Sequence, residues 1–397
     1  MFITADLIHT GTKFLPQGAV IEVAYNGTII AIHESGLSLR GTKQPNSQFP
    51  ITNSYNGILC PGFVNAHCHM ELSHMKGAIP EGQTLIPFLK HIPLHRNDYT
   101  QEQKDIARIN GYNELLANGV VAVGDICNTT DTLDVRAQNK MHIHSFVESI
   151  GFTQTPDRQF NYAIQVYDTF AAQQQEEKRL SQSIVPHAPY SVSQELFSRI
   201  DQHNLNSLIS IHNQESPAED EYYLMKKGTV PELLQTLGID DTFFQPSGKS
   251  SLQTYLQWFA STHPFIFIHN TYTSLTDIEL ARTLIPNLYW CFCPNANIYI
   301  ESRLPDIDLF IREKQNICIG TDSLASNHQL SILAELTTIK NHNPHIDWET
   351  LLTWATSNGA KALQMDNLVG SLTPGTQPGI LHFSNINTPQ PAITRII

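Results

Sequence analysis

Two histidines separated by one residue, His67 and His69, form the first metal-binding pattern in the chain. They end the mostly apolar run Pro-Gly-Phe-Val-Asn-Ala-His-Cys-His that begins at Pro61. If the run is a strand, alternate side chains point to one face, so both imidazoles can reach one ion while Cys68 points away. The pair predicts a metal site, although two ordinary strand histidines would give the same pattern.

Other chemically capable side chains follow later apolar runs. His212 precedes Glu215 by three residues, a spacing that can place the carboxylate beside a metal-bound water. The alternative is a strand that runs into a solvated acidic loop. His187, His269 and Asp322 also end apolar runs. Each signal is modest alone, but polar groups at so many corresponding positions predict one shared site.

Short apolar runs that alternate with amphipathic segments would position these side chains. Such runs, rich in Val, Ile and Phe, are typical of buried parallel strands. We expect strands at 57–65, 120–126, 142–148, 182–187, 208–212, 265–269, 288–293 and 316–321, with helices such as 101–118 and 330–338 between them.

Eight strands that alternate with helices predict a (β/α)₈ TIM barrel of α/β class. The competing fold, a doubly wound open sheet, lacks its Gly-x-Gly-x-x-Gly sequence after the first strand. In a barrel the active site lies at the C-terminal ends of the strands, where the polar residues occur.

The two ends of the chain have a different character. Short β-like runs at 20–25 and 28–32 are separated by turn residues and a polar stretch near 41–48, and turn-rich sequence returns from about residue 370. We expect residues 1–57 and 366–397 to pair into a small β-sandwich domain that flanks a barrel domain at 58–365.

The composition and charge of the chain limit the kinds of molecule that it can bind. The chain has 397 residues, a formal charge of −13 and six cysteines without zinc-finger spacing, and a pI near 5.7. That charge disfavours nucleic acid and anionic membranes as partners. The sequence lacks a secretory pattern and an apolar run of about 18 residues. We therefore expect a cytoplasmic protein with a small-molecule substrate, with a homodimer as one option.

Imidazoles and a carboxylate together suit a divalent ion of the first transition row. Zn²⁺ is the favoured ion, and Fe²⁺ and Mn²⁺ are also compatible. Such an ion can lower the pKa of a bound water from about 15.7 to roughly 7. A carboxylate beside that water can accept its proton, and a second acidic group can pass it to a substrate. The constellation predicts a metal-dependent hydrolase.

With these motifs, the sequence resembles the amidohydrolase superfamily, in the branch of cytosine, guanine and S-adenosylhomocysteine deaminases and triazine chlorohydrolases. The resemblance covers nearly the whole chain, through the run at Pro61, His212-Asn-Gln-Glu215, His269 and the stretch Gly-Thr-Asp-Ser-Leu-Ala-Ser-Asn from Gly320. The motifs are specific for the branch but not for a substrate.

The resemblance implies a role for each motif residue. One metal ion would be bound by His67, His69, His212 and Asp322. Asp322 would also take the proton from the attacking water, Glu215 would shuttle it to a ring nitrogen and the leaving group, and His269 would hold the hydroxide. His187 matches a substrate-contacting histidine. Relatives with two metals use a carboxylated lysine at the end of strand four, which is absent here, so one ion is implied.

The implied reaction is hydrolytic deamination of an aromatic amidine carbon, on a purine-type ring or nucleoside. The Glu71-Leu-Ser run and the stretch 146–151 look similar to aminodeoxyfutalosine deaminases, which favours an adenosine derivative. Glu71 and Glu148 would bind ribose hydroxyls or the polar end of the substrate. For Glu71 a role in holding a ligand imidazole is an equal alternative.

Two other functions stay open. A chlorohydrolase or another C–N hydrolase that acts on guanine-, cytosine- or triazine-like rings could share this site, because hydroxide attack does not depend on the leaving group. A non-catalytic assembly protein is disfavoured, since every expected ligand is present. The segment 291–299 resembles a substrate-binding loop of the branch and is a poor Cys-x-Cys metal site.

Overall fold

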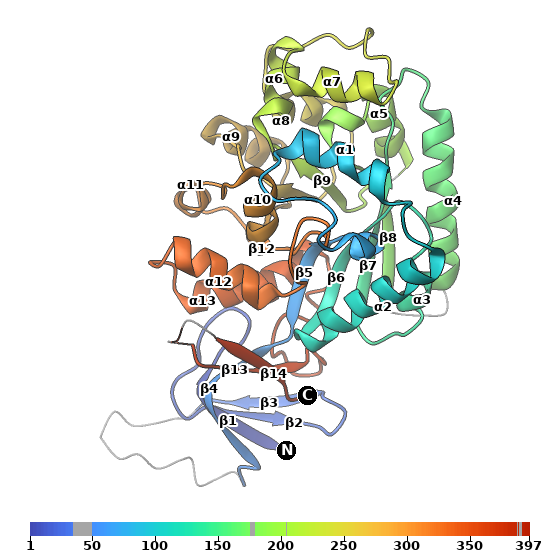
Figure 1. Ribbon diagram of the computed structural model, residues 1–397. Helices are drawn as coiled ribbons and strands as arrows, with labels where there is room; N and C mark the ends of the chain where they lie inside the picture. The colour runs from blue at the N-terminus through green and yellow to red at the C-terminus, as the bar shows by residue number, and fades with distance from the viewer. Residues whose placement is uncertain (35–49, 175–178, 204, 387, 389–390) are drawn as a thin grey trace.

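Eight parallel strands line the centre of the larger part of the molecule (Figure 1). The structure is a computed structural model that describes residues 1–34, 50–174, 179–203, 205–386, 388 and 391–397. One four-stranded sheet contains β5 (Phe63–Cys68), β6 (Val120–Cys127), β7 (His142–Ser149) and β8 (Leu180–Pro186). The other contains β9 (Ile209–Asn213), β10 (Phe265–His269), β11 (Leu288–Phe292) and β12 (Ile317–Ile319).

The edges of the two sheets meet at two seams. At the β5–β12 seam the carbonyl of His67 accepts hydrogen bonds from the N–H groups of Thr321 and Asp322, at 3.0 and 3.1 Å. At the β8–β9 seam the N–H of His212 donates to the carbonyl of His187 at 3.0 Å. Within the described residues no strand ladder spans either seam. The parallel α/β architecture is confirmed, but the barrel is not closed by continuous pairing.

Helices separate the strands along the chain and cover the outside of the two sheets (Figure 1). The predicted helices at 101–118 and 330–338 correspond to α2 (Gln101–Ala117) and α12 (Ile332–His342). Thr100 starts α2 with a reciprocal capping box to Gln103. The helices are α1 (Leu85–His95), α2 (Gln101–Ala117), α3 (Leu133–Arg136), α4 (Asp157–Gln174), α5 (Gln194–His203), α6 (Pro217–Met225), α7 (Thr229–Thr236), α8 (Ser251–Tyr255), α9 (Leu275–Leu284), α10 (Pro294–Glu301), α11 (Ile307–Arg312), α12 (Ile332–His342), α13 (Trp348–Thr353) and α14 (Gly359–Ala362).

The apolar strand runs are buried on both faces, as parallel strands between a barrel interior and a helical layer must be. All eight residues of β6 and all five of β10 are buried. The largest core cluster packs outward-facing strand residues such as Phe267 and Trp290 against the helices. None of the helices that the structure describes has both the length and the apolarity needed to cross a membrane.

Both ends of the chain contribute to a third sheet, which lies beside the strand-and-helix part (Figure 1). Its order is β14-β13-β4-β1-β2-β3, with β1 (Phe2–Ile8), β2 (Val20–Val23), β3 (Ile29–His33), β4 (Asn53–Pro61), β13 (Ile380–Ser384) and β14 (Ala392–Arg395). The pairing of the two ends is confirmed. The described residues form one sheet here, so the expected β-sandwich is not confirmed, and the domain boundaries stay a prediction. The polar stretch 41–48 lies outside the described residues.

The first predicted barrel strand, 57–65, was wrong in its bounds. The apolar run is divided between two sheets: β4 ends at Pro61 in the end sheet, and β5 starts at Phe63 in the barrel. Gly62 makes the transition, where a Cβ atom would lie 2.2 Å from Val121 Cγ1 and 2.7 Å from the Pro378 carbonyl oxygen. Hydrophobicity could not reveal this division, because the end of β4, from Ile58 to Pro61, is as buried as β5.

Candidate metal and catalytic site

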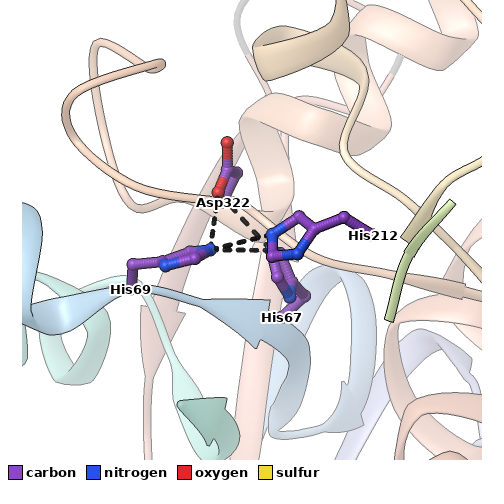
Figure 2. A group of neighbouring side chains, drawn as sticks. All are labelled: His67, His69, His212 and Asp322. Carbon is purple, nitrogen blue, oxygen red and sulfur yellow. Dashed lines mark hydrogen bonds and ion pairs between the residues drawn. The ribbon is translucent and has the colours of Figure 1, made fainter. Parts of the chain in front are cut away.

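Four side chains from the two sheets converge at the C-terminal ends of the barrel strands (Figure 2). His67 lies in β5 and His69 directly follows it, His212 lies in β9, and Asp322 follows β12. One ligand atom from each of the four lies within 4.8 Å of the others. The structure thus brings together the set His67, His69, His212 and Asp322 that the sequence predicts.

The distances within this group are those of side chains that face a common centre. His69 Nε2 lies 3.1 Å from His67 Nε2 and 3.3 Å from His212 Nε2. Asp322 Oδ1 lies 3.4 Å from His67 Nε2 and 3.3 Å from His69 Nε2. Cys68 is buried in the core behind the site, as the alternation of side chains along a strand predicts.

The protonation states of these candidate ligands suit the binding of a cation. Burial lowers the pKa of His69 to about 3 and that of His212 well below its ordinary value, so both imidazoles are neutral near pH 7. Burial alone would raise the pKa of Asp322, but the hydrogen bond of His67 and the nearby imidazoles hold it well below the usual range. Neutral imidazole nitrogens around a carboxylate are the donor set that a divalent metal prefers.

Hydrogen bonds behind the ligands orient them. His212 Nδ1 donates to the carbonyl of His187 at 2.8 Å, which leaves Nε2 as the ligand atom. The hydroxyl of Ser326 donates to Asp322 Oδ2, which leaves Oδ1 toward the imidazoles. Among the described residues His67 Nδ1 has no hydrogen-bond partner. Gly320 leaves room for His67, because a Cβ there would lie 2.8 Å from His67 Cβ.

Glu215 and His269 lie beside the four ligands. His269 Nε2 is 3.6 Å from Glu215 Oε1, and both side chains are buried. His269 Nδ1 donates to Asn297 Oδ1 at 3.3 Å, so Nε2 is the acceptor nitrogen of the neutral ring. Burial lowers the pKa of His269 to about 4, while burial and Asp322 raise the pKa of Glu215 well above its usual value. The pair combines a proton-accepting nitrogen with a carboxyl group that favours its protonated form.

The predicted substrate residues fall into two groups. His187 and Glu148 line the cavity above the ligands, and Glu148 Oε1 lies 3.4 Å from His212 Nδ1. Glu71 is buried and outside the cavity lining; its carboxylate accepts hydrogen bonds from Thr129 and from the N–H of Asn128, at 2.9 to 3.0 Å. Those contacts hold the loop after β6 rather than a ligand imidazole. Its assignment to the substrate stays a prediction.

A cavity of about 760 Å³ opens above the four ligands. Its floor includes Glu215, His269 and Asp322, and its outer wall is apolar. The apolar wall consists mainly of Leu85, Phe88, Leu89, Ile92, Phe152, Leu233, Leu234, Leu237, Ile239 and Phe243. Sequence reasoning missed this wall, because apolar residues on α1 and α7 are also typical of ordinary core positions. Arg96, at the end of α1, is the single Lys or Arg among the lining residues described.

A model of the amidohydrolase family matches residues 58–396, so the chain belongs to the amidohydrolase family. This confirms the resemblance seen in the sequence. An adenosine deaminase of Helicobacter pylori is 28% identical over 79% of this chain and 76% of its own length. A 5-methylthioadenosine/S-adenosylhomocysteine deaminase of Teredinibacter turnerae is 26% identical over 82% of this chain and 71% of its own.

A solved structure shows the same fold. It is the Helicobacter pylori aminofutalosine deaminase in complex with methylthio-coformycin, with a TM-score of 0.77 and 21% identity. The match covers 96% of this chain and 91% of that one. At this identity the likeness establishes the fold alone, and it extends over both the end sheet and the barrel strands.

Proposed function

We propose that the protein is a metal-dependent hydrolytic deaminase of an adenosine derivative. The observation that carries the proposal is the convergence of three imidazoles and Asp322 beside the Glu215–His269 pair at a cavity floor. Family membership and relatives that deaminate adenosine-type compounds support it.

The proposed metal is one Zn²⁺ ion, held by His67, His69, His212 and Asp322. Imidazole nitrogens and a carboxylate oxygen are ligand types that Zn²⁺ accepts in catalytic sites. When bound, the ion supplies Lewis acidity that makes a water at the cavity floor easier to deprotonate. A second group of ligand-type atoms, from Glu148, His187 and His212, shares His212 with the first. We therefore propose one ion, because two separate ions would both need His212 as a ligand.

The chain's own residues move the protons. We propose that Asp322 accepts the proton of the attacking water and that Glu215 delivers a proton to the ring nitrogen next to the reacting carbon. His269 Nε2 accepts a hydrogen bond from the attacking oxygen. A C–O bond forms, the C–NH₂ bond then breaks, and the second water proton leaves with the amine as ammonia. The ring keeps the N–H that Glu215 supplied and becomes a lactam. The proton held by Asp322 passes to Glu215, so both side chains regain their starting states.

The cavity favours a nucleoside over a free base. Its volume of about 760 Å³ lies in the upper part of the range of small-molecule sites and exceeds what a bare ring fills. His187 Nδ1 lies 2.6 Å from the hydroxyl of Ser191, which itself donates to Ala188, so Nε2 of the neutral ring is left as an acceptor. Burial raises the pKa of Glu148 to about 8. The His187 nitrogen and a Glu148 oxygen can each accept a hydrogen bond, which suits ribose hydroxyls as donors.

Aminodeoxyfutalosine and other 5′-substituted adenosines are the favoured substrates. The apolar outer wall would contact an extended 5′ substituent, and Arg96 would meet an acidic group at its end. Location in the cytoplasm and assembly as a homodimer stay predictions from the sequence.

Two measurements test the proposal. Elemental analysis of the purified protein should find about one equivalent of a divalent metal, and zinc is the metal we expect. Ammonia release should then be measured with adenosine, 5′-substituted adenosines, guanine, cytosine and amino- and chloro-triazines. Release from adenosine derivatives supports the proposal, whereas chloride or ammonia release from triazines or free bases alone would favour the alternative hydrolases. No release from any compound by metal-loaded protein would contradict deamination.

A further inference from the structure

Glu335 on α12 is a fully buried carboxylate that stands behind the site. It accepts hydrogen bonds from the N–H and the Nδ2 group of Asn295, at 2.8 and 3.0 Å, and from Asn327 Nδ2 at 2.8 Å. All these partners are N–H donors, and no Lys or Arg forms an ion pair with Glu335 in the described part of the chain. Burial raises the pKa of Glu335 to about 8. Taking a carboxyl group out of water is costly, and one whose hydrogen-bond partners are all amide N–H groups calls for a reason beyond packing.

One connection leads from Glu335 to Asp322. Asn327 Nδ2 donates both to Glu335 Oε1 and to the carbonyl oxygen of Thr321, each at 2.8 Å. Thr321 directly precedes Asp322, whose backbone adopts a left-handed φ of 58°. A left-handed conformation costs energy in a residue with a side chain and persists where the surroundings hold it. Glu335 therefore fixes the Asn327 amide that anchors this turn.

A second connection leads to His269. Asn295 and Asn297 lie in the first turn of α10, which starts at Pro294. Asn295 is fixed by Glu335 on one side of the turn, and its Oδ1 accepts from Thr338 of α12 at 2.6 Å. Two residues later, Asn297 Oδ1 accepts from His269 Nδ1 at 3.3 Å, and its Nδ2 donates to Thr271. The same turn thus joins Glu335 to the imidazole beside the reacting atoms.

We infer that Glu335 is a positioning residue that sets where Asp322 and His269 stand relative to one another. The inference rests on the proposed function for the roles of those two groups. It also gives a role to the segment 291–299, which resembles a substrate-binding loop in sequence but has no residue in the cavity lining: its first helical turn carries the connection from Glu335 to His269. Glu335 itself touches neither substrate nor metal, since it is outside the cavity lining.

The variant Glu335→Gln tests the inference, because it keeps the shape but replaces one acceptor oxygen with a donor group that faces other donors. The matched control is Glu349→Gln. Glu349 lies on α13, accepts the Phe14 N–H at 2.6 Å and is outside the cavity lining, so it reports the general cost of such a change. Each protein is loaded with Co²⁺, and its cobalt content and visible absorption spectrum are recorded before any substrate is added. Steady-state deamination is then measured with zinc-loaded protein.

We expect Glu335→Gln to bind one equivalent of Co²⁺ with a shifted visible spectrum, and to lower kcat by ten-fold or more with KM within three-fold of wild type. The control should match the wild type in both readouts. An unchanged Co²⁺ spectrum, loss of Co²⁺ binding, or the same spectral change in the control overturns the inference. If wild-type protein deaminates nothing, the proposed function fails, and the spectrum still decides the role of Glu335.

A second variant covers the case in which Glu335→Gln does not fold. Asn327→Ser removes the donor that joins Glu335 to Thr321 but leaves the carboxylate paired with Asn295. The same spectral and kinetic changes are expected, in smaller measure. A folded Asn327→Ser protein with the wild-type Co²⁺ spectrum overturns the inference.

Discussion

At the scale of single residues, the site is built from backbone conformations that side-chain-bearing residues rarely adopt. His269 has a φ of 69°, Asn270 of 58°, Asp322 of 58° and Gln214 of 44°. Each such residue costs about 1–3 kcal/mol. They occur where the chain leaves β9, β10 and β12, at the positions that carry Glu215, His269 and Asp322. Stability is given up there in order to aim these side chains at one point.

Replacing Glu215 with glutamine should separate metal binding from proton transfer. The amide keeps the volume of the side chain but cannot deliver a proton, so we expect kcat to fall by about 10²-fold or more. Glu215 is not among the four ligand residues, so metal content should stay near one equivalent. Metal analysis and steady-state kinetics on the same preparation check both points. A Glu215→Gln protein with wild-type kcat would refute the shuttle role.

At the scale of elements, the two seams between the four-stranded sheets coincide with the site. At the β5–β12 seam a side chain takes the place of a strand ladder. Asn65 Nδ2 donates to Thr321 Oγ1 at 2.8 Å, and Asn65 Oδ1 accepts from the Thr321 N–H at 3.1 Å. Because metal ligands stand on both sides of this seam, the join between sheets and the geometry of the site depend on the same contacts.

Asn65→Ala should therefore loosen both the fold and the metal site. Loss of the buried hydrogen bonds should lower the free energy of unfolding by about 1–3 kcal/mol. Metal affinity should fall as well, because His67 and Asp322 are no longer tied through this side chain. Asn118→Ala, which removes a half-buried hydrogen bond to the Leu330 carbonyl, is the control and should leave metal affinity unchanged. Urea unfolding and a chelator competition titration measure the two effects; equal metal affinity in Asn65→Ala and wild type would contradict the prediction.

The β7–β8 pair should make the protein sensitive to acid. His144 on β7 is buried between the hydroxyls of Ser181 and Ser183 on β8, at 2.8 and 3.0 Å, and burial lowers its pKa to about 3. Below its ordinary value of 6.5, the unfolded chain binds a proton at this residue that the folded protein does not. Stability is therefore lost as pH falls from 6.5 toward 3, by up to about 1.4 kcal/mol per pH unit from this group.

The variant His144→Gln isolates that contribution. Urea unfolding between pH 7 and pH 4 should show a shallower loss of stability in the variant than in the wild type. Metal-free protein is used for both, so that protonation of the metal ligands does not add to the slope. Parallel pH profiles of the two proteins would show that His144 carries no such linkage.

At the scale of the whole molecule, a bound ion would join the two halves of the barrel. His67 lies in the first four-stranded sheet and His69 directly follows its strand β5, whereas His212 lies in the second sheet and Asp322 follows its strand β12. Since neither seam is closed by a ladder, the ion would bridge sheets that otherwise meet through a few hydrogen bonds and packed side chains. The site would then stabilise the fold as well as serve the reaction.

Metal removal should lower the Tm measurably. A ligand that binds only the folded state adds about 4 kcal/mol of stability at a thousand times its Kd. Differential scanning calorimetry of loaded, chelator-treated and zinc-reloaded protein should show a drop in Tm on chelation and its recovery on reloading. Equal Tm values for protein with and without one bound equivalent would show that the ion does not bridge the sheets.

The sequence by itself determined the residues of the candidate site and the class of fold. His67, His69, His212, Glu215, His269 and Asp322 could be found because each follows an apolar run, and parallel strands bring their C-terminal ends to one edge. That rule needs only the order of strands along the chain. It does not need their exact bounds, so the group was found even though 57–65 proved to be two strands.

Only the tertiary structure decided what surrounds that group. Glu71 turned out to hold a loop, Asn65 to join two sheets, and Glu335 to stand behind Asp322 and His269. These roles depend on contacts between residues far apart in the chain, for example 256 positions for Asn65 and Thr321. A buried Glu or Asn has the same local sequence signal whatever its partner, because hydrogen bonds across elements leave no periodic pattern in the chain.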